Sequence, residues 1–376
     1  MVENALFYKD NYMREFVSVV TKIETIKEGK YKVVLDNTAF YPEGGGQPSD
    51  VGRLNDAEVS FVEEKNNEIL HTVNKYIEVG TKVHGIIDFE KRLSNMQSHT
   101  AEHIVSGIIC KTYDATNVGF HIGKDFITID FNKAIDHSDL VKIEKEANEA
   151  VYKNIKIVTR IYSNDETKNI EYRSKKELKE DVRIVEVPGY DRCACCGIHV
   201  TRTGEIGAIK LLRIENYKSG VRIYMIAGYK AIQDYTDKYN QVNNISTLLS
   251  VKLEDVYDEV KKLKEEYDEL KVKQNSLKLE ILKKQIENVK KENIILEIDD
   301  LNGNEMKTFC SFILKEKKTN VAGIVSNNKF ILMSDKEDLK KKLEEIKKTL
   351  DIKGGGNSAL IQGQFTCDSK EFIKLI

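Results

Sequence analysis

Two short clusters of metal-ligand residues constrain the fold of this chain more than any other feature of its sequence. His99 and His103 are four residues apart in a segment with helical periodicity, so both imidazoles lie on one face of the helix, about one turn apart. The second cluster runs from Cys193 to His199 and contains three thiols and one imidazole. If one ion takes ligands from both clusters, the fold must bring these two distant segments together.

The donor atoms of the two clusters favour zinc. The 376 residues include only six cysteines and seven histidines, and a disulfide knot is disfavoured in a chain without export features. Imidazole nitrogens and a thiolate suit four-coordinate zinc. Glu102 does not directly follow His99, so the zinc-peptidase motif is absent. We expect one zinc ion per chain and no peptidase activity.

The composition excludes several classes of protein. Lys and Arg total 59 against 61 Asp and Glu, so bulk charge does not attract nucleic acid, and local geometry must hold any polyanion. No apolar run approaches the roughly 18 residues of a membrane span. The start of the chain lacks a basic region followed by an apolar stretch. We therefore expect a soluble, cytoplasmic protein without a membrane partner.

The sequence predicts an α+β protein with four parts. Short β-type runs over residues 1–88 predict a small β-barrel that includes a glycine-rich turn. Residues 89–228 alternate helical and strand patterns and predict an α+β zinc-binding domain. Residues 229–293 predict a long helical neck or coiled coil. Residues 294–376 predict a small C-terminal α/β domain.

A heptad seam distinguishes the neck. Its positions alternate in steps of four and three, and Gln274 is its one polar member. The seam comprises Leu249, Leu253, Val256, Val260, Leu263, Tyr267, Leu270, Gln274, Leu277 and Ile281. Two interpretations stay open: a solvated antiparallel helical hairpin, or a coiled coil that makes the protein a homodimer.

The C-terminal domain is predicted from short apolar runs and one helical segment. A helix over residues 336–350 is expected to have Asp335 as its cap. The predicted strands are residues 294–298, 309–314, 321–325 and 330–333. Lys353 and the three glycines after it could hold a phosphate, although a glycine C-cap and loop explains them equally well.

The glycine-rich turn lies ahead of the histidine pair. Gly44, Gly45 and Gly46 are consecutive, which lets the backbone approach a ligand closely and present N–H groups to it. Gln47 follows and offers both an amide donor and an acceptor. A loop without function is the alternative.

Taken in order, these segments resemble the editing domain of alanyl-tRNA synthetase and its free-standing AlaX-type relatives. The similarity covers nearly the whole chain, and the helical neck matches by position and pattern more than by residue. The segments that carry it are Thr38–Gln47, the pair His99 and His103, and the pair Cys195 and His199. The run Lys353–Gly356 resembles the glycine stretch of the DHH-associated domain at the end of the synthetase.

The resemblance implies a hydrolase that removes serine, and sometimes glycine, from wrongly charged tRNA for alanine. It implies that Thr38 senses the serine hydroxyl and that Gln47 binds the aminoacyl end, which makes these two the catalytic candidates. The zinc ligands that it implies are His99, His103, Cys195 and His199. The substrate-binding candidates are Gly44, Gly45, Gly46 and His121, and the tRNA-binding candidates are Lys353, Gly354, Gly355 and Gly356.

Some alternatives stay open. Cys193 or Cys196 could replace Cys195 as the sulfur ligand. A non-catalytic, zinc-stabilised tRNA-binding or oligomerisation protein would use only the second cluster, but its ligands are tightly spaced and the histidine pair is then unexplained. The resemblance begins near the first residue and no Asp-His-His run occurs. We therefore expect neither tRNA charging nor phosphoesterase activity.

Overall fold

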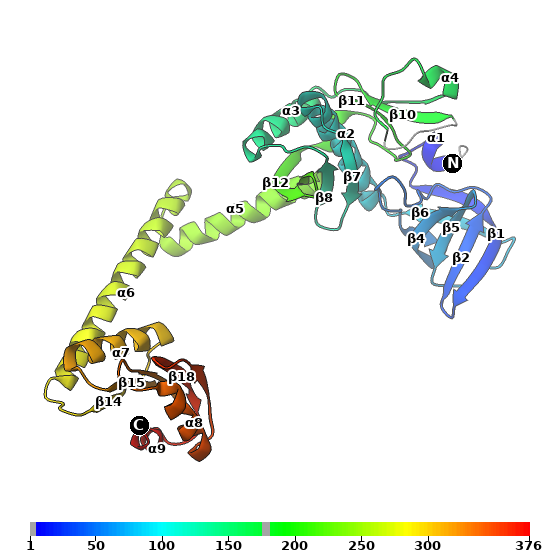
Figure 1. The fold of residues 1–376 in the computed structure, drawn as a ribbon. Helices are drawn as coiled ribbons and strands as arrows, with labels where there is room; N and C mark the ends of the chain where they lie inside the picture. The colour runs from blue at the N-terminus through cyan, green and yellow to red at the C-terminus, as the bar shows by residue number, and fades with distance from the viewer. Residues whose placement is uncertain (1–4, 175–180) are drawn as a thin grey trace. The chain divides into compact units, whose positions relative to one another are not determined.

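The computed structural model describes residues 5–174 and 181–376. The chain divides into two compact units, Met1–Gln241 and Val242–Ile376 (Figure 1). Both units combine helices with sheets, which confirms the α+β class. Among the helices of the described ranges, none is long and apolar enough to cross a bilayer.

The first unit begins with a closed six-stranded barrel, in the order β1-β2-β5-β4-β3-β6, as the sequence predicted. Burial alternates along β6, where Val83, Gly85 and Ile87 face inward. A Cβ atom on Gly85 would lie 2.3 Å from the Phe16 ring, so glycine leaves room for this core aromatic. The strands are β1 (Glu15–Lys27), β2 (Lys30–Leu35), β3 (Gly52–Leu54), β4 (Ala57–Lys65), β5 (Glu68–Val73) and β6 (Lys82–Ile87).

Helix α2 (Phe89–Tyr113) follows the barrel and runs through the core of the first unit. Its N-terminus is capped by Asp88, whose side chain accepts a 3.0 Å hydrogen bond from the Lys91 N–H. Every residue from Ser98 to Ile109 is buried. The sequence periodicity identified the apolar face of this helix, and the structure shows that its polar face is buried too.

An ion pair joins the barrel to α2. The Arg92 side chain is fully buried and donates to the Asp50 carboxylate, with Nε 3.1 Å from Oδ2. Its Nη1 also donates to the Met13 carbonyl at 3.0 Å. Asp50 ends the segment that carries the glycine turn, so this contact holds the turn near the helix.

Two further sheets complete the first unit, in the orders β12-β13-β8-β7 and β11-β10-β9. Helix α3 packs against α2 and β12. The strands are β7 (Asn117–Ile122), β8 (Ile127–Phe131), β9 (Val158–Tyr162), β10 (Val182–Val187), β11 (Asp191–Ala194), β12 (Ile209–Tyr217) and β13 (Gly220–Ala227). The other helices are α1 (Leu6–Lys9), α3 (Leu140–Tyr152), α4 (Asn164–Thr167) and α5 (Tyr229–Leu249), the last crossing the boundary between units.

The second unit contains α6 and a five-stranded sheet in the order β14-β15-β16-β18-β17. Only β14 and β15 pair in parallel; the other neighbours are antiparallel. The strands are β14 (Asn293–Glu297), β15 (Val321–Ser326), β16 (Lys329–Met333), β17 (Ile352–Gly356) and β18 (Leu360–Phe365). The helices are α6 (Val256–Ile286), α7 (Gly303–Lys317), α8 (Leu339–Thr349) and α9 (Ser369–Lys374).

Two predictions about the helices of the second unit were wrong. Residues 309–314 belong to helix α7, because Asn302 and Glu305 form a capping box at its start. The apolar residues of α7 then fall on one buried helical face, at Met306, Phe309, Cys310 and Ile313. The cap of α8 is Asp338, which accepts from two backbone N–H groups, and not Asp335.

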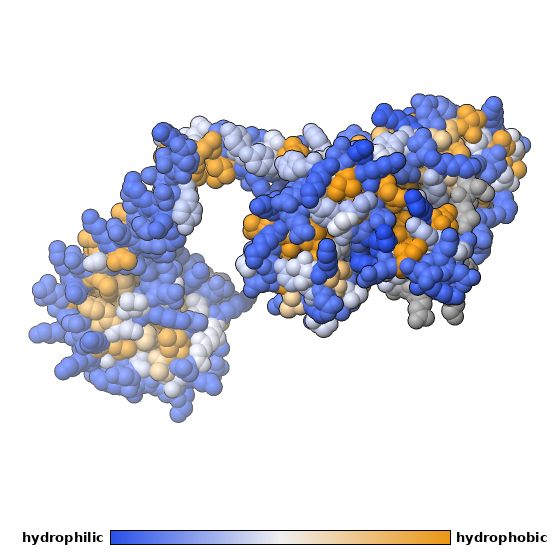
Figure 2. All heavy atoms as spheres, turned by 90° about the horizontal axis from the view of Figure 1, so that it is seen from above, coloured by the Kyte–Doolittle hydropathy of each residue, from blue (hydrophilic) through white to orange (hydrophobic). Residues whose placement is uncertain are grey.

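The heptad seam is largely exposed on α6. Leu263, Tyr267 and Leu270 are 50%, 57% and 66% exposed, whereas Val256 at the start of the helix is buried. Figure 2 shows apolar side chains among hydrophilic ones on the molecular surface. A row of large apolar side chains in water is unfavourable, and a coiled coil would bury this row. The coiled coil therefore stays a prediction.

Candidate metal centre

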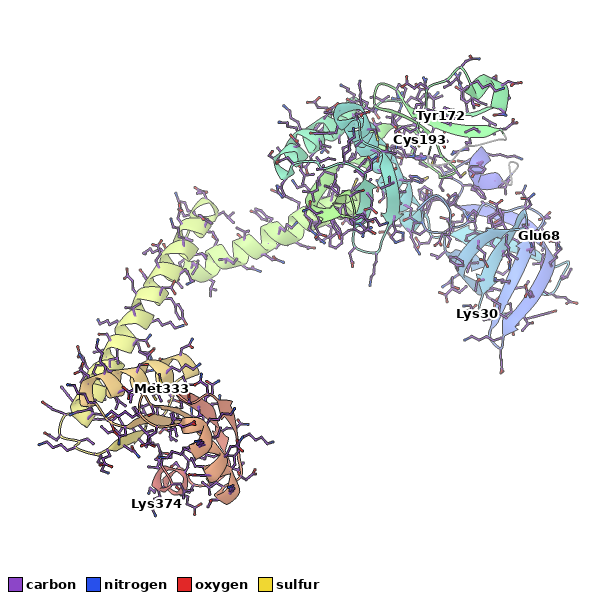
Figure 3. The ribbon with its side chains drawn as sticks, viewed as in Figure 1. Lys30, Glu68, Tyr172, Cys193, Met333 and Lys374 are labelled. Atoms are coloured by element: carbon purple, nitrogen blue, oxygen red, sulfur yellow. The ribbon has the colours of Figure 1, made fainter. Side chains whose placement is uncertain are left out.

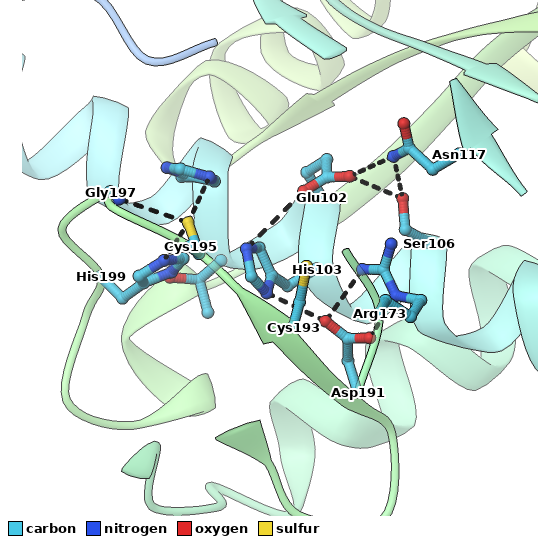
Figure 4. Close-up of polar contacts among 12 residues, drawn as sticks. Glu102, His103, Ser106, Asn117, Arg173, Asp191, Cys193, Cys195, Gly197 and His199 are labelled. Atoms are coloured by element: carbon cyan, nitrogen blue, oxygen red, sulfur yellow. Dashed lines mark hydrogen bonds and ion pairs between the residues drawn. The ribbon is translucent and has the colours of Figure 1, made fainter. Parts of the chain in front are cut away.

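Four side chains from two segments meet in the first unit. Helix α2 supplies His99 and His103, and the loop after β11 supplies Cys195 and His199. Figure 4 labels His103, Cys195 and His199. One ligand atom from each lies within 4.8 Å of all the others. Cys195 Sγ is 3.4 Å from His99 Nε2 and 3.6 Å from His199 Nε2. The structure therefore brings together the two sequence clusters.

The protonation states of Cys195 and His199 favour metal binding. Burial alone would raise the pKa of the Cys195 thiol, but the neighbouring His99 and His103 hold that pKa well below its usual range. Burial and the nearby His99 lower the pKa of His199 to about 3. A thiolate and a neutral imidazole are the forms that ligate a metal ion.

Each imidazole has a polar partner at its second ring nitrogen, and the contact of His103 Nδ1 with Asp191 is an ion pair without hydrogen-bond alignment. Thr100 Oγ1 donates to the Met96 carbonyl at 2.7 Å, so its hydroxyl oxygen accepts from His199 Nδ1. His99 Nδ1 faces the Gln47 carbonyl oxygen in the same way. The three contacts are His99 Nδ1 to Gln47 Oε1, 2.7 Å; His199 Nδ1 to Thr100 Oγ1, 3.1 Å; and His103 Nδ1 to Asp191 Oδ2, 2.9 Å. Such partners leave Nε2 for an ion, and the donor set suits a metal with nitrogen and sulfur ligands.

The three neighbouring thiols have different positions. Among the described residues, Cys193 groups with His103 and Asp191, and burial raises the pKa of Cys193 to about 11, so it stays a thiol. Cys196 is exposed and belongs to neither group. Cys195 is the thiol that contacts both His99 and His199.

The glycine turn positions Gln47. Gly44 and Gln47 bond to each other through both backbone N–H groups, at 3.1 and 3.0 Å. Gly45 and Gly46 between them have φ angles of 60° and 83°, which glycine adopts without strain. A Cβ atom on Gly46 would also lie 2.5 Å from the Phe120 ring. The backbone conformation of the turn and its close approach to Phe120 therefore explain the glycines, and the turn places Gln47 beside His99.

The hydrogen-bond partners of the Thr38 hydroxyl, in the barrel, follow from the structure. Its Oγ1 is 2.8 Å from His71 Nε2, and His71 Nδ1 is 3.0 Å from the Val33 carbonyl oxygen. Burial lowers the pKa of His71 to about 4, so the ring is neutral. The carbonyl can only accept, so Nδ1 carries the proton and Thr38 donates to Nε2. The Phe40 N–H donates to Thr38 at 3.1 Å, which leaves Oγ1 one free lone pair.

The structure does not bring His121 into the metal group. His121 is exposed on β7, and the ring of the preceding Phe120 lies 4.9 Å from that of His99. Successive side chains of a strand point to opposite faces. Phe120 is thus the aromatic wall beside the ligands, a role that the sequence did not indicate.

In the second unit, Lys353 to Gly356 lie in strand β17. The loop interpretation was therefore wrong for these residues. A Cβ atom on Gly354 would lie 2.8 Å from the Gln362 carbonyl of β18, so close strand pairing explains this glycine. Lys353, Lys329 and Gln362 line a cavity of about 320 Å³.

Sequence reasoning missed Thr100 and Asp191, the partners of two ligand imidazoles. Thr100 directly follows His99 but interacts with His199 from the second cluster. Asp191, Cys193 and Cys195 alternate along the chain, and residues two apart share a face of a strand. This alternation could have indicated that Asp191 lies on the same face as the two cysteines.

Comparison with known proteins decides the family. The family model described as "Threonyl and Alanyl tRNA synthetase second additional domain" matches residues 182–224, and "tRNA synthetases class II (A)" matches residues 3–91. The alanyl-tRNA editing protein AlaX-L of Pyrococcus horikoshii is 31% identical over 99% of this chain and 97% of its own length. The chain belongs to the AlaX family of alanyl-tRNA editing proteins.

Two other relatives show how far the similarity extends. AlaX-M of Methanosarcina mazei is 36% identical over 58% of this chain and 94% of its own length. An alanine–tRNA ligase of Methanobrevibacter smithii is 31% identical over 93% of the chain, which spans 42% of that ligase. The AlaX family resemblance is thus confirmed, and the DHH-associated identity of the C-terminal domain stays a prediction.

Proposed function

We propose that this chain is a cytoplasmic trans-editing enzyme that hydrolyses the ester bond of tRNA for alanine carrying serine, or glycine, in place of alanine. The observation that carries the proposal is the buried group of three imidazoles and one thiolate beside Gln47. It occurs in a chain that matches AlaX-L over almost its whole length. One zinc ion per chain is held by His99, His103, Cys195 and His199.

The ester is already activated, so its hydrolysis needs positioning and polarisation more than a strong nucleophile. A zinc ion with four protein ligands would order the pocket, and it would supply Lewis acidity to a water or an ester oxygen if its shell expanded or one ligand left it. Gln47 is buried and holds His99 through Oε1, while its Nε2 has no hydrogen-bond partner within the described ranges. Leaving a buried donor unpaired costs about 1–3 kcal/mol. Gln47 Nε2 therefore donates to an oxygen of the aminoacyl ester.

Thr38 distinguishes serine from alanine. Its remaining lone pair accepts from the serine hydroxyl, because its own proton is directed to His71. Alanine has no hydroxyl to donate, so it leaves this buried oxygen under-satisfied, which is how a polar site rejects an isostere. Gly44, Gly45 and Gly46 form the pocket wall next to Gln47.

The second unit contributes tRNA binding. Lys353, in the strand Ile352–Gly356, lines the cavity of about 320 Å³ described above, and a lysine beside exposed backbone suits a phosphate. In a Lys353→Ala variant we expect weaker tRNA binding, with the zinc content unchanged.

The exposed seam of α6 supports a homodimer. Apolar residues at seam spacing favour pairing with a second helix, and Leu263 and Leu270 are at least half exposed. Sedimentation should give a dimer for the wild-type chain and a monomer for Leu263→Glu/Leu270→Glu. Val272→Glu is the matched control, because Val272 is 71% exposed but lies off the seam. A wild-type monomer at micromolar concentration would refute this part.

The decisive test is deacylation of tRNA for alanine that is charged separately with serine, glycine and alanine. We expect rapid loss of serine or glycine, survival of the alanyl ester, and inhibition by a zinc chelator. His103→Ala should lose the activity. A zinc-loaded protein that binds tRNA but cleaves none of the three esters would instead be the non-catalytic protein. In that case His99→Ala/His103→Ala should keep its zinc.

A further inference from the structure

A second buried cluster adjoins the metal group on the far side of His103. His103, Asp191 and Cys193 offer ligand atoms within 4.8 Å of one another. The side chains of His103 and Asp191 are 2% and 1% exposed. This cluster lies outside the set of four ligands proposed above and requires its own explanation.

Asp191 is held by two cationic or proton-donating partners at once. Arg173 forms a two-pronged pair with it, with Nε 2.6 Å from Oδ1 and Nη2 2.9 Å from Oδ2. His103 Nδ1 lies 2.9 Å from the same Oδ2 (Figure 4). Both carboxylate oxygens are therefore engaged, which leaves Asp191 poorly suited to ligate a second ion.

Backbone pairing sets the position of Asp191. It opens β11, pairs with Val187 of β10, and lies two residues before Cys193, which forms a bridge with Arg173. Figure 3 labels Cys193 and Tyr172, the residue before Arg173 in the sequence, in the same part of the first unit. Bonds from the Arg173 N–H to the Arg192 carbonyl, 2.8 Å, and from the Ala194 N–H to the Arg173 carbonyl, 2.9 Å, join the two segments.

A glycine of helix α2 lets this strand pack closely against the helix. A Cβ atom on Gly107 would lie 2.3 Å from the Tyr190 carbonyl oxygen and 2.8 Å from Asp191 Cβ. Only glycine lets the start of β11 approach the helix this closely, one turn beyond His103. The distance between Asp191 and His103 is thus set by close backbone packing.

We infer that Asp191, braced by Arg173, is the positioning residue for His103. It accepts the Nδ1 proton, which keeps the Nε2 lone pair for the ion, and it stops the ring from rotating. This inference rests on the proposed metal centre. A carboxylate behind a ligand imidazole strengthens metal binding, and its loss typically weakens affinity about 10–100-fold.

The test measures zinc affinity of the full-length protein by competition with a chelator. Asp191→Ala should bind zinc about 10–100-fold more weakly than wild type. Asp191→Asn keeps an acceptor for Nδ1 and should lose less. The cobalt-substituted variants should show altered absorption, because the ligand geometry changes. Asp130→Asn is the matched control: Asp130 forms an equivalent two-pronged pair with Arg222, at 2.6 and 2.8 Å, away from the metal group.

The outcomes separate this inference from the proposed function. Wild-type protein without bound zinc would overturn the metal centre itself. One zinc per wild-type chain, with no greater loss of affinity in either Asp191 variant than in Asp130→Asn, would overturn only the positioning role. Two zinc ions per wild-type chain, of which Asp191→Ala loses one, would make Asp191 a ligand and refute the inference. Unfolding of the metal-free variants, monitored by circular dichroism, shows whether a loss of zinc affinity reflects only a loss of protein stability.

Discussion

A single methyl group at Gly197 should disable the metal centre. A Cβ atom there would lie 2.1 Å from His99 Cε1, 2.3 Å from His99 Nδ1 and 3.1 Å from Gln47 Oε1. Carbon atoms in contact are about 3.5–4.0 Å apart, so the imidazole or the loop must move by more than roughly 1 Å. Metal–ligand distances tolerate only about 0.2 Å. The displacement therefore exceeds what ligation by His99 allows.

The assay is zinc affinity and stoichiometry of Gly197→Ala, measured by chelator competition, together with deacylation of seryl-tRNA. We expect the affinity to fall at least 100-fold, the upper end of what loss of an outer partner causes, because a ligand itself is displaced. Gly303→Ala is the control for zinc binding, since nothing lies within 4 Å of a Cβ atom there. Wild-type affinity in Gly197→Ala would refute the assignment of His99 as a ligand.

Three further predictions concern stability. Arg92→Met should destabilise the first unit by about 3–5 kcal/mol, because it leaves the buried Asp50 carboxylate unpaired; thermal unfolding checks this against Lys75→Met, whose exposed pair is worth under about 1 kcal/mol. The pKa of His71 falls from 6.5 to about 4 on folding, so the unfolded chain binds the extra proton and stability should drop by roughly 3 kcal/mol as pH falls from 6.5 to 4. Acid titration of His71→Leu should lack that part of the slope, and an unchanged slope would contradict it. Chelation should lower the melting temperature of the first unit alone, and calorimetry showing equal loss in both units would contradict this.

Local regularities explain what could be predicted from the sequence. The pairing of His99 with His103 follows from the helical repeat alone, and the alternation of β6 places Val83 and Ile87 inside the barrel. A short apolar run such as residues 309–314 has no such periodicity over enough positions, so strand and helix could not be separated. The capping box that opens α7 carried the missing information.

Partners from distant segments could not be predicted in the same way. Gln47 reaches His99 only because the barrel is fixed to α2, and Thr100 reaches His199 only because the loop after β11 folds back. His121 illustrates the converse. The resemblance made it a substrate-binding candidate, but it is exposed on β7, whereas the ring of Phe120 before it lies against His99.

The burial of α2 links folding to the proposed chemistry. A helix enclosed on all sides has no solvent to satisfy its polar side chains, so each needs a partner inside the protein. Glu102 receives hydrogen bonds from Ser106 and Asn117, both at 2.6 Å, and the two ligand histidines of the helix are held by Gln47 and Asp191. The same contacts that satisfy the buried helix therefore also orient the ligands. A change in this polar network should weaken zinc binding and folding together, whereas a change on the barrel surface should affect neither.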